Sequence, residues 1–239
     1  MESVPVLRRA LDLVPQGREY SVIASLPKNS ATLAVRAEEA GVDALMMNVD
    51  GEEGGPPNHY GSFDLHDAYI KDVISTVSLP CGLFIGGSKE LTADYWERIM
   101  EVPFGFVEMY AHHMPAFVLS DERVRKVIAV ATGYIVEQVR QLSIMDGVEA
   151  VDMATVQAQA RGGPFTVLDY ATLGVIASVT TKPLLLRTQK RLSREDIGMV
   201  VSKGVKGLVV DPSILSGTDE AYKDELEALT PRRDLAEAQ

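Results

Sequence analysis

The stretch AGVDAL, residues 40–45, recurs in similar form at two later positions, and this repeat decides the fold. The other copies are DGVEAV at residues 146–151 and KGVKGL at residues 203–208. Each copy follows a stretch with helical periodicity. Glycine is favoured just past a helix end, where φ turns positive, and valine followed by aliphatic residues is typical of a buried strand. Each copy therefore predicts a junction between a helix and a buried strand.

Working outward from these junctions predicts strands and helices that alternate along the chain. The predicted strands span residues 20–26, 43–49, 81–86, 104–110, 126–132, 148–154, 183–188 and 206–210. The predicted helices span residues 31–40, 64–77, 92–101, 114–123, 134–145, 165–179, 194–203 and 218–229, and an extra helix over about residues 4–14 precedes the first strand. Ser193 and Asp196 are placed as a capping box at one helix start.

Eight strand–helix units in 239 residues predict a (β/α)8 barrel, with residues 1–239 forming a single domain and the extra helix at its N-terminus. A doubly wound open sheet is the alternative. It usually needs fewer units, and no predicted strand opens with the glycine fingerprint of a dinucleotide site. The chain therefore resembles the TIM-barrel superfamily over nearly its whole length, and this resemblance is to a fold and not to one family.

The composition is that of an acidic globular protein. The net charge is −11, with 46% hydrophobic and 24% charged residues. A negative field of this size opposes binding to nucleic acid and to anionic membrane surfaces, although local basic residues can still hold an anionic substrate. No apolar run approaches the ~20 residues of a transmembrane helix. We therefore expect no nucleic-acid partner and no membrane association.

Cysteine usage and the N-terminus indicate the compartment. Cys81 is the single cysteine, so no intrachain disulfide can form. The N-terminal residues lack the basic and then apolar layout of a secretory signal. Both features fit a cytoplasmic protein.

Polar residues gather at the carboxyl ends of the predicted strands, where (β/α)8 enzymes place their active sites. Residues two apart on a strand face the same way, so these side chains share the barrel mouth. They are Ser25, Asn48, Asp50, Glu108, Tyr110, Asp152, Arg187, Gln189 and Asp211, with Lys28, Arg161, Gly162, Gly163 and Lys190 in the loops. Because a buried charge is costly unless paired or used, the ring predicts either an active site or structural ion pairs around Arg187.

Roles can be assigned from the chemistry of these side chains. We expect the catalytic residues to be Asp50, Glu108, Asp152 and Lys28. Asp50 and Glu108 can move protons, or they can hold a divalent metal such as Mg²⁺ or Mn²⁺, which prefers oxygen ligands. The expected substrate-binding residues are Asn48, Tyr110, Arg161, Gly162, Gly163, Arg187, Gln189, Lys190 and Asp211. Asp50 can also be a simple turn residue, and His112 and His113 fit a solvated loop pair.

The loops after the seventh and eighth strands, TQKRLS and DPSILSGT, lack the paired glycines that wrap a phosphate. No nucleotide cofactor is therefore expected. ARGGP at residues 160–164 is an alternative anion site, because an arginine and two glycines precede a predicted helix. GGSK at residues 86–89 is another. A Schiff-base mechanism is disfavoured, since no lysine lies inside a predicted strand near its end.

Residues 40–61 resemble ribulose-phosphate epimerases at Val49-Asp50-Gly51, Pro57-Asn58 and Gly61. This resemblance implies that Asp50 is an acid or base for proton transfer next to a carbonyl. The chain departs from that family at three strands. Methionines replace the histidine of the second strand, the third strand has no histidine, and the seventh ends in RTQK. The metal site of the epimerases is therefore not carried over, and neither is their activity.

The leading functional hypothesis is a lyase or isomerase that acts next to a carbonyl on a small anionic metabolite, either a carboxylate or a phosphorylated compound. Arg187, Lys28 and Arg161 would hold the anion. A non-catalytic ligand-binding or scaffold barrel is the alternative. The apolar residues 114–119 form either an oligomer interface or the buried face of a short helix. We expect a homo-oligomer.

Overall fold

The computed structural model describes residues 18–51, 60–216 and 218–231, and the structural statements below concern these residues. The predicted helix at residues 4–14 lies outside them, as do Pro57 and Asn58 of the epimerase-like segment. Among the described residues, no helix is long and apolar enough to cross a membrane.

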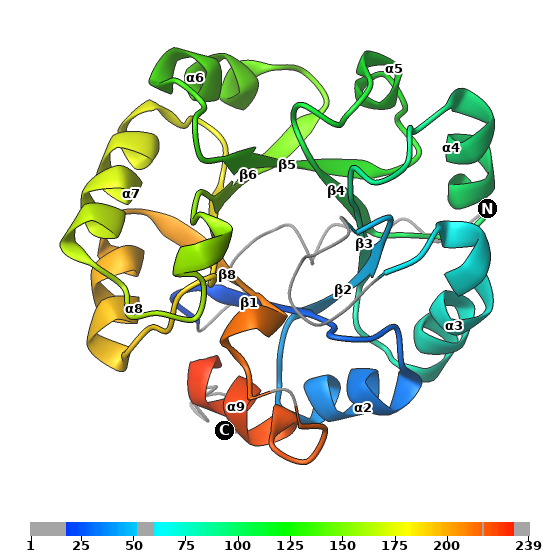
Figure 1. Ribbon diagram of the computed structural model, residues 1–239, viewed down its shortest axis with the longest axis horizontal. Coiled ribbons are helices and arrows are strands. Elements are labelled where there is room, and N and C mark those ends of the chain that lie inside the picture. Colours follow the sequence, from blue (N-terminus) through cyan, green and yellow to red (C-terminus); the bar gives the residue numbers. More distant parts are fainter. Residues whose placement is uncertain (1–17, 52–59, 217, 232–239) are drawn as a thin grey trace, which may run out of the picture.

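Eight parallel strands close into a barrel in the order β1 to β8, with helices around the outside (Figure 1). The strands are β1 (Ser21–Ser25), β2 (Ala44–Val49), β3 (Cys81–Ile85), β4 (Phe106–Tyr110), β5 (Arg125–Ala131), β6 (Val148–Ala154), β7 (Leu184–Arg187) and β8 (Val205–Val210). The helices are α2 (Ala31–Glu39), α3 (Phe63–Thr76), α4 (Ala93–Met100), α5 (Ala116–Leu119), α6 (Val136–Ile144), α7 (Val167–Val179), α8 (Arg194–Ser202) and α9 (Tyr222–Leu229). The 3-10 helices η1 (Ala158–Ala160) and η2 (Pro212–Ile214) lie in the loops after β6 and β8. The predicted (β/α)8 fold is confirmed.

The glycines of the repeated junctions adopt the conformation that the sequence predicts. Gly41, Gly147 and Gly204 have φ of 79°, 81° and 98°. At Gly147 a side chain would also lack space, since an added Cβ would lie 2.5 Å from the Leu119 carbonyl oxygen. These positions turn the chain from a helix into the next strand.

The predicted helix at residues 114–123 is shorter in the structure, where α5 ends at Leu119. The chain beyond it is held in a turn by the Asp121 carboxylate. This carboxylate accepts hydrogen bonds from the Arg123 backbone N–H at 2.9 Å and from Trp96 Nε1 at 2.7 Å. Within α5, Val118 is buried and Phe117 is 41% exposed, so the apolar stretch is partly core and partly surface.

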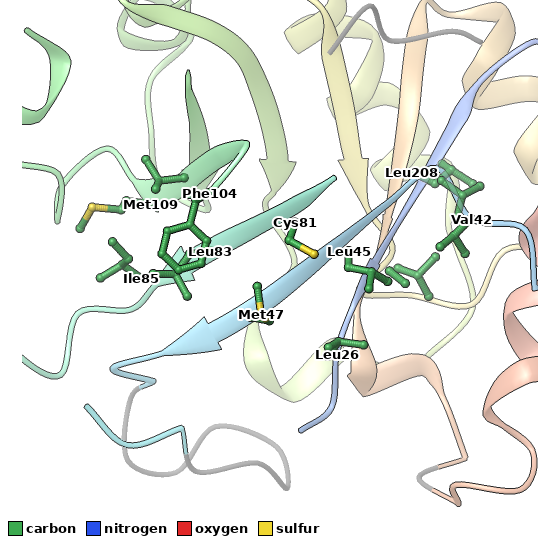
Figure 2. Packing of buried hydrophobic residues seen from close by; sticks show 14 of the residues in the cluster. Leu26, Val42, Leu45, Met47, Cys81, Leu83, Ile85, Phe104, Met109 and Leu208 are labelled. Atoms are coloured by element: carbon green, nitrogen blue, oxygen red, sulfur yellow. The ribbon is translucent and has the colours of Figure 1, made fainter. Parts of the chain in front are cut away.

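The core has an outer layer between strands and helices and an inner layer inside the barrel. Figure 2 shows part of the outer layer, where Leu45, Met47 and Leu83 pack near Cys81, which is buried in the core. The inner layer consists of Ile23, Ala44, Met46, Phe106, Val127, Ala150, Leu185 and Val209. Most of these residues lie two or four positions before the predicted polar residues on the same strands. The polar side chains therefore follow the inner layer toward the carboxyl ends of the strands.

Phe106 fills the interior at the start of β4. Its ring lies over Gly82 of β3, where an added Cβ would come within 2.3 Å of ring atoms. Glycine at position 82 is what makes room for the ring. Phe106 is only 1% exposed, so the barrel is packed below the polar layer.

Candidate active site

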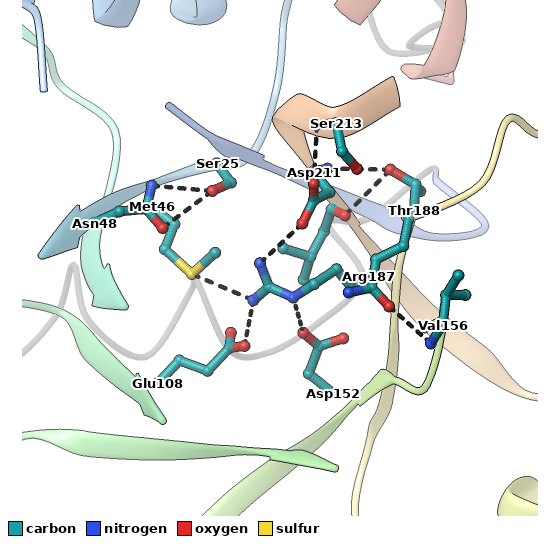
Figure 3. Close-up of polar contacts among 12 residues, drawn as sticks. Ser25, Met46, Asn48, Glu108, Asp152, Val156, Arg187, Thr188, Asp211 and Ser213 are labelled. Carbon is teal, nitrogen blue, oxygen red and sulfur yellow. Dashed lines mark hydrogen bonds and ion pairs between the residues drawn. The ribbon is translucent and has the colours of Figure 1, made fainter. Parts of the chain in front are cut away.

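Arg187, the last residue of β7, is the centre of the polar layer (Figure 3). Its Nε donates to Asp152 Oδ2 at 2.9 Å, and its Nη2 donates to Glu108 Oε1. Its Nη1 lies 3.7 Å from Asp211 Oδ2, and the guanidinium carbon lies 4.9 Å from the centre of the Phe84 ring. Arg187 thus faces carboxylates from β4, from β6 and from the start of the loop after β8.

Burial makes these charges depend on one another. Glu108 and Asp152 are 0% exposed and Arg187 is 5% exposed. Burial raises the pKa of Glu108 well above its usual value, and Asp152 raises it further, while Arg187 opposes the shift. Burial lowers the pKa of Arg187, but the surrounding carboxylates outweigh this effect and hold the pKa well above its usual value. Arg187 is therefore a fixed cation.

A cavity of about 160 Å³ borders Arg187 at the barrel mouth. Of the residues predicted to bind substrate, it brings together Asn48, Tyr110, Arg161, Arg187, Gln189 and Asp211. Its volume lies below the ~300–1,000 Å³ typical of sites for drug-sized ligands, which favours a small metabolite. Glu108 and Asp152 are not among the described lining residues, so they reach the cavity only through Arg187.

Several polar side chains of the cavity are already engaged by the scaffold. The Asn48 amide donates to Ser25 Oγ at 3.1 Å and to the Leu26 carbonyl at 3.0 Å. Tyr60 donates to the same carbonyl at 2.5 Å, and Gln189 Oε1 accepts from the Val156 backbone N–H at 3.0 Å. These groups shape the mouth and leave little hydrogen-bonding capacity for a ligand.

Asp50 does not line the cavity. It follows β2 with φ of 52°, a left-handed conformation that aspartate tolerates better than most residues. This turn takes its side chain out of the inward alternation of the strand, and its Oδ2 accepts a hydrogen bond from Tyr95 of α4 at 2.8 Å. Burial raises the pKa of Asp50, and the hydrogen bond from Tyr95 opposes that shift. The residue ties β2 to α4.

The lysines predicted for the site also lie outside the cavity. The Lys28 side chain is 67% exposed, and its Nζ lies 3.9 Å from Asp219 Oδ1. Lys190 forms an ion pair with Asp169 at 2.6 Å. Both lysines follow the ends of strands, but their side chains point away from the barrel axis.

The segment ARGGP contributes Arg161 to the cavity, but its glycines do not surround an anion. Gly162 N–H donates to the Gln189 carbonyl at 2.9 Å, and the Gly163 carbonyl accepts from Arg191 N–H at 2.9 Å. The helix that follows starts at Val167 and is already capped, because Thr166 and Asp169 form a capping box. The segment is a strap between the loops after β6 and β7, and its arginine faces the mouth.

The predicted metal ligands do not meet, since Asp50 contacts Tyr95 while Glu108 contacts Arg187. Among the described residues, no three His, Cys, Asp or Glu side chains lie together as a metal site. The cation Arg187 occupies the position between Glu108 and Asp152, where it would repel a metal ion. The use of Mg²⁺ or Mn²⁺ stays a prediction, and we derive no catalytic step through a metal.

Sequence reasoning assigned no ligand-binding role to three residues that line the cavity. Phe84 and His113 line it with Tyr110, and the Phe84 and Tyr110 rings meet edge to face at 5.7 Å. The ring of His113 lies against Gly87, where an added Cβ would be 2.0 Å from it, so the paired glycines of GGSK were the available signal. Ser213, which follows Asp211 after the eighth predicted strand, also lines the cavity, although its position alone gave it no role.

The fold and the site together define the chain as a (β/α)8 barrel with a charged mouth. No protein-family model matches the sequence, and the search of curated proteins found no match. Among solved structures, a variant of the tryptophan synthase alpha-subunit from Pyrococcus furiosus has a TM-score of 0.65 at 16% identity, covering 87% of this chain and 97% of that chain. The N-acetylmannosamine-6-phosphate 2-epimerase from Clostridium perfringens has a TM-score of 0.58 at 12% identity, covering 85% and 90%. At these identities the likeness shows the fold alone.

Proposed function

We propose that the protein is an enzyme of the lyase or isomerase type, which performs acid–base chemistry next to a carbonyl on a small anionic metabolite. The observation that carries this proposal is the placement of Arg161. It lines the cavity together with Arg187 and Asp211, and its buried Nε has no hydrogen-bond partner among the described residues. A cation that has no partner among the described residues and shares a cavity with a carboxylate suits an anionic ligand that undergoes proton transfer.

Asp211 is the carboxylate that we assign to proton transfer, because it lines the cavity and its side chain is 14% exposed. Its Oδ1 accepts a hydrogen bond from Ser213 N–H at 2.9 Å, which fixes the orientation of the carboxylate. Glu108 and Asp152 contact Arg187 and not the cavity, so we assign them as positioning residues. This assignment differs from the sequence-based expectation, in which Asp50 and Glu108 carried the chemistry.

The structural neighbours support the proposal only through their names. One is a synthase subunit, and the other is an epimerase of a phosphorylated sugar. Cytoplasmic location and homo-oligomerisation remain predictions of the sequence.

Proton transfer can be tested by hydrogen exchange. The protein would be incubated in D₂O with a panel of small keto and hydroxy carboxylates and sugar phosphates, and NMR would record loss of the C–H signal next to the carbonyl. For a responsive compound we expect Asp211→Asn to slow exchange by ~100- to 10,000-fold while binding is retained. Asp219→Asn is the matched control, because Asp219 is exposed and outside the cavity.

The competing function is a ligand-binding barrel without turnover, and one observation favours it. Arg187 is compensated by its own carboxylates, as in a structural ion-pair cluster. Binding of panel compounds without exchange or product in the wild-type protein would support this function and contradict the enzymatic one. Exchange that Asp211→Asn leaves unchanged would contradict the role of Asp211.

A further inference from the structure

Two polar side-chain atoms in the loops after β6 and β8 are buried without a hydrogen-bond partner among the described residues. They are Nε of Arg161, in the loop after β6, and Oγ of Ser213, in the loop after β8. Both residues line the same cavity. Buried polar groups in folded proteins are almost always hydrogen-bonded, so a pair of such atoms at one cavity indicates that a group other than the described residues satisfies them.

The two loops that carry these atoms are in contact. Gly162, the residue after Arg161, has φ of 72°, and an added Cβ would lie 3.4 Å from the Ser213 carbonyl oxygen. The Gly162 N–H donates to the Gln189 carbonyl at 2.9 Å, which holds the loop after β6 in place. The positive φ turns the chain directly after Arg161, so that this residue and Ser213 lie at the same side of the mouth.

Asp211, after β8, and Asp169, in α7, are both engaged by other partners. Asp211 Oδ1 accepts from Ser213 N–H, and Asp211 Oδ2 faces Arg187 Nη1 at 3.7 Å. Asp169 is taken by Lys190 at 2.6 Å. Asn48 and Gln189, elsewhere around the cavity, are engaged by the scaffold. Among the described residues, Nε of Arg161 and Oγ of Ser213 therefore keep their hydrogen-bonding capacity free.

We propose that Arg161 and Ser213 form an oxyanion subsite, which binds the carboxylate or phosphate group of the ligand on the side of the mouth formed by the loops after β6 and β8. Arginine offers only donors and a delocalised positive charge, and the serine hydroxyl adds a further donor, so the pair matches an oxyanion and not a cation or an apolar group. The inference rests on the proposed function in that it places the anionic end of the same ligand. The remainder of that ligand then extends toward Asp211 and Arg187.

The subsite can be tested with inorganic phosphate and acetate as separate probes, by titration calorimetry and by thermal melting. We expect Arg161→Gln to weaken binding of the preferred probe by about 10- to 100-fold and Ser213→Ala by about 5- to 10-fold. Arg191→Gln is the matched control. It removes the same charge from an exposed residue of the next loop, which does not line the cavity. Preference for phosphate or for acetate identifies the group that the subsite takes.

Two further variants keep the outcomes separable. Arg161→Lys retains the charge but not the fork of donors, so we expect intermediate affinity. Melting temperatures close to that of the wild type verify that the variants are folded. If Arg161→Gln and Ser213→Ala bind both probes as the wild type does, the subsite is overturned. If these variants lose binding and the wild type shows no turnover, the oxyanion subsite is supported and the proposed enzymatic function is contradicted. If Arg161→Gln and Ser213→Ala bind the probes normally and Asp211→Asn loses turnover, the enzymatic function is supported and the subsite is contradicted.

Discussion

Replacing Arg187 by methionine tests whether the centre of the barrel mouth is held by its charges. The variant keeps an unbranched side chain of moderate length but removes the cation that faces Glu108, Asp152 and Asp211 among the described residues. Two of these carboxylates are 0% exposed, so their charges would remain buried without a partner. Breaking a buried ion pair in this way typically costs ~3–5 kcal/mol. That is a large fraction of the ~5–15 kcal/mol by which a domain is stable.

The sign of the pH dependence follows from proton linkage. Without Arg187, which opposes the effect of burial, the pKa of Glu108 rises further, so Glu108 keeps its proton in the folded variant at a pH where the unfolded chain has lost it. The folded state then binds more protons, so the stability of the variant falls as pH rises and recovers as pH falls. Each extra proton contributes a slope of up to ~1.4 kcal/mol per pH unit. We therefore expect Arg187→Met to be most destabilised, relative to the wild type, near neutral pH and least near pH ~4.

Urea unfolding followed by circular dichroism at several pH values measures both the loss of stability and its dependence on pH. Arg123→Met is the matched control, because Arg123 also contacts two acids, Asp121 and Glu97, but its side chain is 50% exposed. Ion pairs at such a surface contribute little, so we expect only a slight change there. A loss below ~1 kcal/mol in Arg187→Met, with no dependence on pH, would refute the view that these buried charges depend on one another.

Two further predictions concern single side chains inside the barrel. Glu108→Gln should change stability little at pH ~4 and below, where glutamine resembles the protonated glutamate, and should be more stable than the wild type at neutral pH, because burial raises the pKa of Glu108. The wild type should lose stability relative to this variant as pH rises from the unfolded pKa of ~4.3 toward the raised folded value, which chemical unfolding at three pH values can follow. Gly82→Ala should destabilise by ~1–3 kcal/mol, because its Cβ would overlap the Phe106 ring. Gly198→Ala, at an exposed position of α8 with nothing within 4 Å, should instead stabilise by ~0.5–1 kcal/mol. Equal melting temperatures for the two glycine variants would contradict this reasoning.

The order of strands and helices was predictable because it depends on local periodicity and on glycines at turns where φ is positive. Gly41, Gly147 and Gly204 marked the same kind of junction, and the structure places all three at positive φ. The inward direction of Glu108 and Arg187 followed from the alternation of side chains along a strand. The cluster around Arg187 could therefore be predicted from the sequence, with two interpretations left open. It could be an active site or a structural ring of ion pairs.

The direction of the loop side chains was not predictable in the same way. Asp50 keeps the spacing of an inward residue, but its positive φ turns it to Tyr95. Lys190 follows a strand end and still turns away to Asp169. Ser213 becomes notable only when the partners of every neighbouring polar atom are known. Such outcomes depend on contacts between loops far apart in sequence, which periodicity does not encode.

The ring of Phe106 over Gly82 closes the inside of the barrel at the end opposite the mouth. A compound can therefore enter and leave the polar layer only through the mouth, so an occupant of the cavity stands in the path of any water molecule exchanging with Arg187. While the compound is bound, the dielectric constant around the guanidinium is lower. The electrostatic attraction between Arg187 and a nearby negative charge is therefore stronger. The same closed end that stabilises the fold thereby makes the strength of the central cation depend on occupancy of the mouth.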